Sequence, residues 1–332
     1  MNNEYLFKLD PENAFAAFWL ENQWRSDTVL GIPALEVVEK NKDTYIKVVS
    51  ALSRQEVMAD LMALLTKVHT TDADGFPLFV WLDEEPKTIN AAVVNGELLI
   101  PEGVIIIPHD AFQNRNDIIN VVIPNSVRYI ECGAFWNCSN LTKVTFGKNV
   151  RSIGNGAFWH CKNLTDLVIP NSTLNIGFDA FGSCYNLTNV RFGDNLKSIE
   201  GLAFHNTKIQ NITIPDTVED IGRSAFEYCT NLTNVRLSNN LTYIALETFI
   251  GCTSLKRISM SKSLERIDQK AFYGCESLTK IVLPDSVWCV SYEAFAECLN
   301  LKEVIVSKRT FDITGDSFSS SFDDDNIIIV KQ

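Results

Sequence analysis

A phenylalanine returns at a nearly constant interval through most of this 332-residue chain. The interval is 23 residues at every step except one, which is 22 residues. A fixed period of this length indicates stacked structural units, each too small to enclose a core alone, which bury their apolar side chains against their neighbours. The ten phenylalanines are Phe112, Phe135, Phe158, Phe181, Phe204, Phe226, Phe249, Phe272, Phe295 and Phe318.

Two further apolar positions keep the same register. An isoleucine, or once a valine, lies five residues before each phenylalanine, and a pattern L-x-x-[VI]-x-[ILFM] follows most of them. The alternation that ends this pattern is typical of a strand with one face turned inward. Eleven candidate strands run from Leu98 to Ile329. At about 4.8 Å per coil, they predict a parallel sheet roughly 48 Å long.

The complete unit reads I-G-x-x-A-F-x-x-C-x-x-L-T-x-V-x-[IF]-P, as in the segment from Ile153 to Pro170. Over about residues 93 to 332, this pattern resembles the BspA-type leucine-rich repeat. The resemblance implies a right-handed leucine-rich-repeat solenoid over residues 91–332, with one parallel β-sheet of about 10–11 short strands. It also implies a bacterial protein that acts as a binding scaffold or surface adhesin and has no shared catalytic residue.

Residues 1–90 lack the repeat and are predicted to form a small α/β domain. Asp10-Pro11 is typical of a helix start, and Ser53 with Glu56 forms a capping box. The domain is either an independent module or a cap over the exposed first edge of the solenoid. Its predicted elements are a helix over 11–24, a strand over 44–52, a helix beginning near Ser53 and a strand over 76–82.

The nine cysteines follow the repeat rather than a disulfide framework. Equivalent side chains in a parallel stack point the same way, whereas a disulfide needs the two Cβ atoms to converge, and zinc needs its ligands to surround a point. We therefore expect a buried column of reduced thiols. Cys132 and Cys289 lie off the column, and either is a candidate for a reactive surface thiol. The column holds Cys138, Cys161, Cys184, Cys229, Cys252, Cys275 and Cys298.

The net charge and the composition of individual segments limit the classes of partner that the protein can bind. The net charge of −12 disfavours nucleic acid and anionic membrane surfaces. The first residues contain no secretory signal, and no apolar run reaches the roughly 20 residues of a membrane-spanning helix. The sequence as it stands predicts a cytoplasmic protein without membrane insertion, or a surface or secreted one if a leader was removed.

No catalytic or metal-binding set emerges from the repeats. His69, His109, His160 and His205 fall in different repeat positions or domains, and none has a predicted acid or nucleophile partner. The acidic runs at 72–75 and 323–325 are interpreted as solvated turns rather than calcium sites. We expect no cofactor, no metal and no enzyme in the solenoid, and leave the question open for residues 1–90.

Binding residues are expected at strand positions that face solvent, because the repeat does not prescribe them. In the middle coils these positions form a polar, locally basic patch suited to an anionic or carboxylate-bearing partner protein. Towards the end they form an apolar patch, which marks either a contact site or simply β-propensity. The first patch is Asn189, Arg191, Asn211, Thr213, Asn234 and Arg236, and the second is Val282, Ile305 and Ile328.

Trp136 and Trp159 occupy the same position in consecutive coils and are expected to stack. Paired tryptophans suit contact with a protein or a glycan, or with the amino-terminal domain. A further irregularity is the single short coil, in which one residue is missing before Ile209 and Thr207 replaces the column cysteine. We interpret it as a shortened turn, with a slight change of curvature as the alternative.

Three functions remain open from the sequence. The first is a non-catalytic protein-binding scaffold that uses the strand surface. The second is an effector or enzyme whose activity resides in residues 1–90 and which the repeats target. The third is an adhesin that binds a glycan. Fold alone does not separate these functions.

Overall fold

The structure is a computed structural model, and it describes residues 3–8, 34–40, 43–50, 89, 91–306, 312–313, 317 and 328–331. The chain divides into two compact units, Met1–Thr88 and Ile89–Gln332. In the first unit, β1 (Asn3–Lys8), β3 (Asp43–Ser50) and β2 (Ala34–Lys40) form an antiparallel sheet in that order. The strand predicted over 44–52 corresponds to β3. The predicted helices over 11–24 and from Ser53, and the predicted strand over 76–82, lie outside the described residues.

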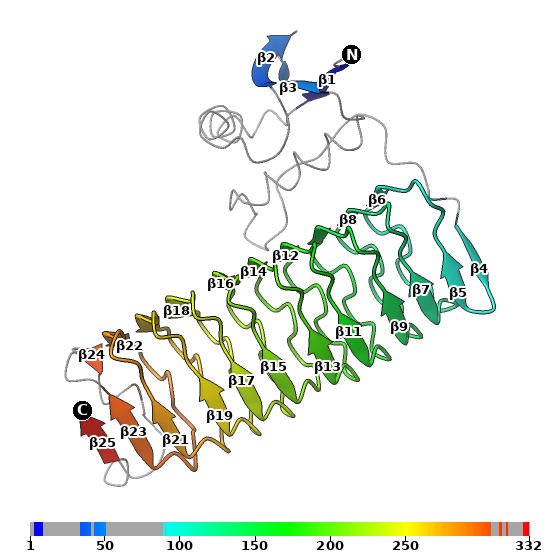
Figure 1. Cartoon of the computed structure of the whole chain (residues 1–332). Coiled ribbons are helices and arrows are strands. Elements are labelled where there is room, and N and C mark those ends of the chain that lie inside the picture. The colour runs from blue at the N-terminus through cyan, green and yellow to red at the C-terminus, as the bar shows by residue number, and fades with distance from the viewer. Residues whose placement is uncertain are drawn as a thin grey trace. The chain divides into compact units, whose positions relative to one another are not determined.

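The second unit is a parallel β-solenoid, as the repeat predicts (Figure 1). Its inward L-x-x-V positions form a first row of short strands, stacked coil on coil. We call this row and its solvent side the strand face. Its strands are β5 (Glu97–Leu99), β7 (Asn120–Val122), β9 (Lys143–Thr145), β11 (Asp166–Val168), β13 (Asn189–Arg191), β15 (Asn211–Thr213), β17 (Asn234–Arg236), β19 (Arg257–Ser259), β21 (Lys280–Val282), β23 (Glu303–Val306) and β25 (Ile328–Lys331).

A second row of two-residue strands accompanies the predicted one. It arises because the isoleucine five residues before each phenylalanine also pairs with its counterpart in the next coil, as Ile153 does with Ile176. The described residues contain no α-helix between the two rows. The strands of this row are β6 (Ile106–Ile107), β8 (Tyr129–Ile130), β10 (Ser152–Ile153), β12 (Asn175–Ile176), β14 (Ser198–Ile199), β16 (Asp220–Ile221), β18 (Tyr243–Ile244), β20 (Arg266–Ile267), β22 (Cys289–Val290) and β24 (Asp312–Ile313).

The first edge of the strand face is covered by a hairpin from the same unit. Strand β4 (Ala92–Val94) pairs antiparallel with β5. Asn95 and Gly96 join them with φ angles of 51° and 81°, the left-handed conformations that a two-residue hairpin turn requires. The exposed backbone edge of β5 is therefore paired before the first full coil begins.

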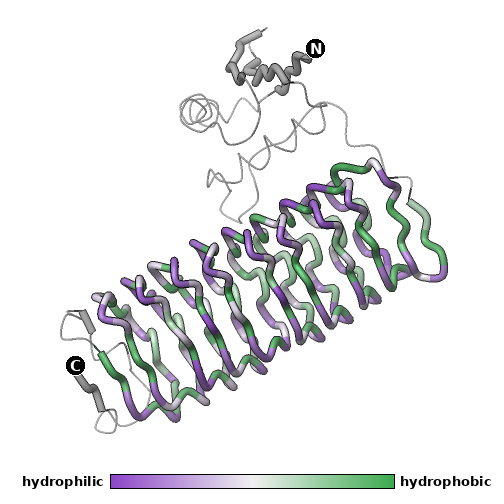
Figure 2. Tube along the Cα trace, in the orientation of Figure 1, coloured by the Kyte–Doolittle hydropathy of each residue, from purple (hydrophilic) through white to green (hydrophobic). Residues whose placement is uncertain are grey.

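The phenylalanines from Phe112 to Phe295 form one continuous column, as the sequence predicts, and Phe318 lies outside the described residues. From Phe135 to Phe295 every ring is completely buried. Neighbouring rings stack nearly parallel, with centroids 4.9 Å apart for Phe135 and Phe158 and 5.6 Å apart for Phe204 and Phe226. Each phenylalanine N–H also donates to a carbonyl in the next coil, as Phe135 does to Ala157 at 2.7 Å. Side chain and backbone thus hold the same pair of coils together. Figure 2 shows the apolar and polar stretches recurring along every coil.

The cysteine column is buried and contains no disulfide, as predicted. Each of the seven thiols donates to the carbonyl of the phenylalanine in the preceding coil, from 3.0 Å for Cys138 to 3.4 Å for Cys275. In the short coil Thr207 takes the same place, with its Oγ1 3.2 Å from the Cys229 Sγ. Burial raises the pKa of Cys138 to about 12 and that of Cys229 to about 11. The column therefore holds protonated thiols that act as small hydrogen-bond donors.

Replacement of one column ring should destabilise the solenoid strongly. Phe158→Ala removes a fully buried ring and is expected to cost about 3–5 kcal/mol in the free energy of unfolding, measured by denaturant titration. Phe146→Ala is the matched control, because Phe146 is only partly buried against the edge of the Phe158 ring. An equal loss for both variants would contradict the column as the main source of stability.

Thiol labelling should separate the two classes of cysteine. Because the column thiols are buried and protonated, a thiol reagent at neutral pH should modify the half-buried Cys289 first and Cys132, whose pKa burial also raises, more slowly, and should leave the column thiols unmodified in the native protein. All nine cysteines should react after denaturation. Mass spectrometry of the labelled peptides measures this, and rapid native labelling of Cys161 or Cys252 would contradict it.

Candidate binding cleft on the strand face

The side chains on either side of the inward strand residue face solvent. In β13 and β15 the middle residues Val190 and Ile212 are buried. Their neighbours are exposed, and so are those of the buried Val235 in β17. The exposed neighbours in these three strands are the six residues of the predicted polar patch: Asn189, Arg191, Asn211, Thr213, Asn234 and Arg236. The strand face therefore presents side chains that the repeat leaves free to vary.

The hydrogen-bonded ladder along this face is interrupted between β13 and β15. Strands β11 and β13 pair over three residues, and so do β15 and β17. Among the described residues, no such pairing joins β13 to β15, although the phenylalanine column continues without a gap between these coils. The core of the solenoid is thus continuous where its strand face is broken.

The short coil contributes one cause of this interruption. In coils of normal length the leading leucine N–H donates to the column cysteine carbonyl and closes a turn, as Leu187 does to Cys184 at 2.9 Å. The missing residue removes this turn from the short coil. Lys208 N–H instead donates to the Leu187 carbonyl of the preceding coil, at 3.0 Å. The segment that leads into strand β15 is therefore held by a different hydrogen bond from the segments that lead into the neighbouring strands.

A bulky inward side chain contributes a second cause. Where the residue just after the central strand triplet is a buried Ile or Leu, its N–H donates to the next coil, as Ile169 does to the Arg191 carbonyl at 2.8 Å. Phe146, Phe192 and Met260 occupy this position but are only partly buried, and none of them makes this bond. After Phe146 the ladder shrinks to one pair, and after Phe192 and Met260 it is lost. A larger, only partly buried side chain at this position thus coincides with a shortened or missing ladder to the next strand.

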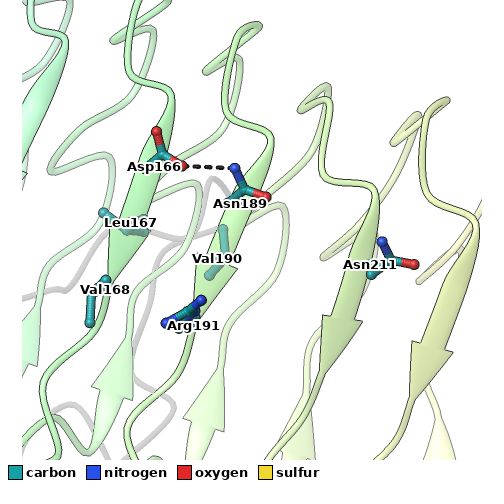
Figure 3. A pocket seen from close by; sticks show the side chains of 7 residues that line it. All are labelled: Asp166, Leu167, Val168, Asn189, Val190, Arg191 and Asn211. Carbon is teal, nitrogen blue, oxygen red and sulfur yellow. Dashed lines mark hydrogen bonds between the residues drawn. The ribbon is translucent and has the colours of Figure 1, made fainter.

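A cleft of about 440 Å³ lies beside this interruption. Figure 3 shows Asp166 and Asn189 at one end of the cleft and Arg191 further along β13, with Asn211 on the opposite strand. Its residues come from three consecutive coils, and Val168 is 62% exposed. The cleft lining consists of Asp166, Leu167, Val168, Asn189, Val190, Arg191 and Asn211.

The charges of the predicted polar patch are not equally available. Arg236 donates to both carboxylate oxygens of Asp216 at 3.0 Å, and its guanidinium also reaches the Ile214 carbonyl. Within the described residues, Arg191 has no such acidic partner. The expected basic patch of three coils is therefore reduced to one available guanidinium, because an aspartate in the preceding turn neutralises the other.

The amides of the patch are fixed by contacts between coils. Asn189 Nδ2 donates to Asp166 Oδ1 at 2.7 Å, and Asn234 Nδ2 donates to Asn211 Oδ1 at 2.6 Å. The hydrogen bonds from Asn189 and Thr165 lower the pKa of Asp166, so its carboxylate is ionised at neutral pH. The cleft accordingly offers one cation, one anion, two oriented amides and an apolar contact at Val168.

The predicted apolar patch needs one correction. Val282 and Ile305 are cross-strand partners, as expected, and both line a second cleft of about 390 Å³. Ile328, however, pairs with Glu303, and Val330 takes the place opposite Ile305. The last coil is two residues longer than the repeat, so counting by 23 places Ile328 in the wrong row.

The tryptophan pair is stacked but half-buried. The ring centroids of Trp136 and Trp159 lie 4.2 Å apart at an interplanar angle of 27°. His160 stacks on Trp159 at 4.9 Å, and Tyr185 meets His160 edge-on at 5.6 Å. Aromatic rings of three consecutive coils thus form one cluster, in which the neighbouring rings cover part of each face.

The expectation that no histidine has an acid or nucleophile partner is wrong for His109, which lies beside Asp110, and for His205. His205 has two partners. Its Nδ1 lies 3.0 Å from Asp179 Oδ1, and its Nε2 lies 3.2 Å from Ser183 Oγ. Both partners belong to the preceding coil, 26 and 22 residues earlier, so comparison of equivalent repeat positions missed them. The available signal was Gly182, which leaves empty the position that Trp159 and His205 fill in the coils on either side.

The described residues show no grouping of three or more His, Cys, Asp or Glu side chains that could hold a metal ion. No helix in this part of the chain is long and apolar enough to cross a membrane.

Comparison with protein families matches residues 105–233 and 197–323 to a model described as the BspA type leucine rich repeat region, in six copies. No curated protein matches the chain.

Several solved structures are similar to this chain. A leucine rich cell surface protein from Faecalibacterium prausnitzii is 21% identical, with 73% of this chain and 85% of that chain covered and a TM-score of 0.35. A leucine-rich repeat protein from Eubacterium ventriosum is 22% identical, with 62% and 59% covered and a TM-score of 0.48. A leucine-rich repeat protein from T. pallidum is 25% identical, with 59% and 90% covered and a TM-score of 0.42.

A smaller side chain at position 192 should repair the ladder. In Phe192→Ile, the residue 192 N–H is expected to bond to the Thr213 carbonyl, and its hydrogen exchange should slow by about tenfold. Phe146→Ile is the control in a coil of normal length. Slower exchange only in Phe146→Ile would assign the interruption to the missing residue, and no change in either variant would contradict the role of the bulky side chain.

Proposed function

Because this chain belongs to the BspA-type leucine-rich repeat family, we propose that it is a non-catalytic scaffold that holds a partner protein on its strand face, at the cleft lined by β11, β13 and Asn211 of β15. Leucine-rich repeat families are generally scaffolds without enzymatic activity. The proposal includes a surface or secreted location, which the family resemblance implies.

The division of labour within each coil supports this function. Inward positions carry the stability of the stack, because every coil needs its neighbours to bury them. Outward positions on the strand face are not needed to fill the core, and their residue types differ from coil to coil. A surface of this kind can change its target without changing its fold.

The single observation that carries the choice of site is the position of Arg191 in the cleft. Its guanidinium faces an opening where the strand ladder is interrupted, in a protein of net charge −12. Arginine presents a planar set of donors that matches a carboxylate and binds it through two hydrogen bonds. The proposed partner is therefore a protein segment that carries an exposed Asp or Glu side chain.

The remaining residues of the cleft fit the same partner. The oriented amides of Asn189 and Asn211 can hydrogen-bond to a peptide backbone, and Val168 offers an apolar contact. Asp166 opposes a second acidic group near the other end of the cleft. The cleft thus favours a segment with one acidic side chain over a densely acidic surface.

The aromatic cluster of Trp136, Trp159, His160 and Tyr185 favours a second candidate function, a glycan-binding adhesin. Aromatic rings that combine an apolar face with a polar group are suited to contact with sugars. Tyr185 is 43% exposed at the end of this cluster. An effector activity in residues 1–90 stays a hypothesis, because most of that unit lies outside the described residues.

Charge reversal in the cleft should weaken binding to a carboxylate-bearing peptide. We expect Arg191→Glu to lower the affinity for a fluorescein-labelled peptide with a single Glu by about tenfold or more, because it replaces a charge-assisted hydrogen bond with repulsion. Fluorescence polarisation measures the affinity, and the same peptide with Gln in place of Glu should bind wild type more weakly.

Arg257→Glu is the matched control. Arg257 is an exposed arginine on β19 of the same face, outside the cleft, and its replacement changes the net charge equally. An equal loss of affinity in Arg191→Glu and Arg257→Glu would indicate a general charge effect and contradict the cleft as the site.

A further inference from the structure

His205, Asp179 and Ser183 form a polar cluster that joins two consecutive coils. His205 Nδ1 lies 3.0 Å from Asp179 Oδ1 and 3.1 Å from the Leu202 carbonyl oxygen. On the other side of the ring, Nε2 lies 3.2 Å from Ser183 Oγ. The His205 and Asp179 side chains are only 14% and 17% exposed, and Ser183 is buried. Every polar atom of the ring is therefore engaged at the junction of the two coils.

Gly182 makes room for this cluster. A Cβ atom at this position would overlap the Asp179 carboxylate and would lie 2.6 Å from the His205 ring. The coils before and after carry Trp159 and His205 at the equivalent position. The glycine thus allows the His205 ring to lie over the preceding coil rather than point into solvent.

The cluster lies in the coil that has lost a hydrogen-bonded turn. His205 belongs to the short coil, which lacks the turn that normally leads into the strand. The same coil ends in β15, whose Asn211 lines the cleft opposite Arg191. A contact that positions this coil against its predecessor therefore also positions one wall of the cleft.

The geometry argues against a catalytic role for the cluster, although it contains the groups of a Ser-His-Asp triad. Ser183 is only 5% exposed. The Ser183 N–H donates to the His205 carbonyl and the Cys184 N–H to the Phe181 carbonyl, so neither is available to stabilise an oxyanion. A structural role fits these contacts better.

We infer that His205 and Asp179 form a pH-dependent brace, which holds the short coil against the preceding coil and fixes the width of the cleft at mildly acidic pH. Protonation adds a charge to the ring and turns its contact with Asp179 into an ion pair between coils. Loss of that proton weakens this contact between the two coils. The effect on the cleft rests on the proposed function, whereas the effect on stability does not.

The surroundings of His205 favour the charged ring. Burial opposes the charge, but the nearby Asp179 carboxylate, the Leu202 carbonyl and the negative charge of Glu227 outweigh it and raise the pKa of His205. Burial also raises the pKa of Asp179, against the opposing influence of His205. Of the two partners, His205 is the one whose ordinary pKa of about 6.5 lies between about pH 6 and pH 8.

The sign of the stability effect follows from the raised pKa of His205. The contribution of the brace is fully present below the ordinary histidine pKa of about 6.5, and it is lost as the pH rises through the higher pKa of the folded state. Stability should therefore fall as the pH rises through this window. Removal of the ring should remove the slope.

The experiment compares thermal unfolding of the full chain between about pH 6 and pH 8 in wild type, His205→Asn, Asp179→Asn and His109→Asn. We expect the wild-type midpoint to fall by roughly 2–4 °C across this range, and the slope to vanish in His205→Asn and to shrink in Asp179→Asn. His109→Asn is the matched control, because His109 also contacts an aspartate, Asp110 at 2.8 Å, but is 66% exposed. Its slope should match wild type.

Nuclear magnetic resonance titration of the four histidine rings gives a readout that does not depend on unfolding. The signal that disappears in His205→Asn should titrate above the ordinary pKa. Equal slopes in wild type and His205→Asn, or a His205 pKa at or below about 6.5, would overturn the brace.

Binding of the Glu peptide at the two ends of this pH range then tests the link to the cleft. Weaker binding at the higher pH in wild type, but not in His205→Asn, is the expected result. If the peptide binds neither protein while the stability slope is present, the proposed binding function fails and the brace stands. If binding is independent of pH while the slope is present, the link between brace and cleft is overturned.

Discussion

The stacking of one phenylalanine on the next is the interaction on which the rest of the structure depends. A 23-residue coil cannot bury its own inward side chains, so each coil is stable only between two others. The rings from Phe135 to Phe295 are fully buried, and the backbone beside them bonds in the same direction. This requirement fixes the inward positions and leaves the outward positions of the strand face free.

The candidate cleft arises from small departures within this regular stack. One coil lacks a residue, and Phe192 fills a place that isoleucine or leucine fills in the coils with intact ladders. The column tolerates both changes because the rings before and after still stack. The strand ladder does not tolerate them, because its hydrogen bonds need register as well as proximity. The missing residue and the inward phenylalanine thereby interrupt the strand ladder at the surface.

Many side-chain partners in this fold lie about one coil apart and therefore twenty or more residues apart in sequence. Arg236 is neutralised by Asp216, and His205 meets Asp179 and Ser183, through contacts of this kind. These contacts decide which charges remain available for a ligand. They also explain why the predicted basic patch contracted to Arg191 and why a histidine with no apparent partner has two.

The sequence by itself determined the stack, the inward columns, the buried thiols and the exposed rows. Each of these follows from residue types that recur at a fixed interval. It also indicated the correct region of the strand face, since Asn189, Arg191 and Asn211 all line the cleft. Only the tertiary structure decided where the ladder breaks, how the last coil shifts Ile328 out of its row, and which polar groups pair between coils. These features depend on side-chain direction and on shifts of one or two residues. A repeating sequence pattern describes only what the coils share, so it does not show such differences.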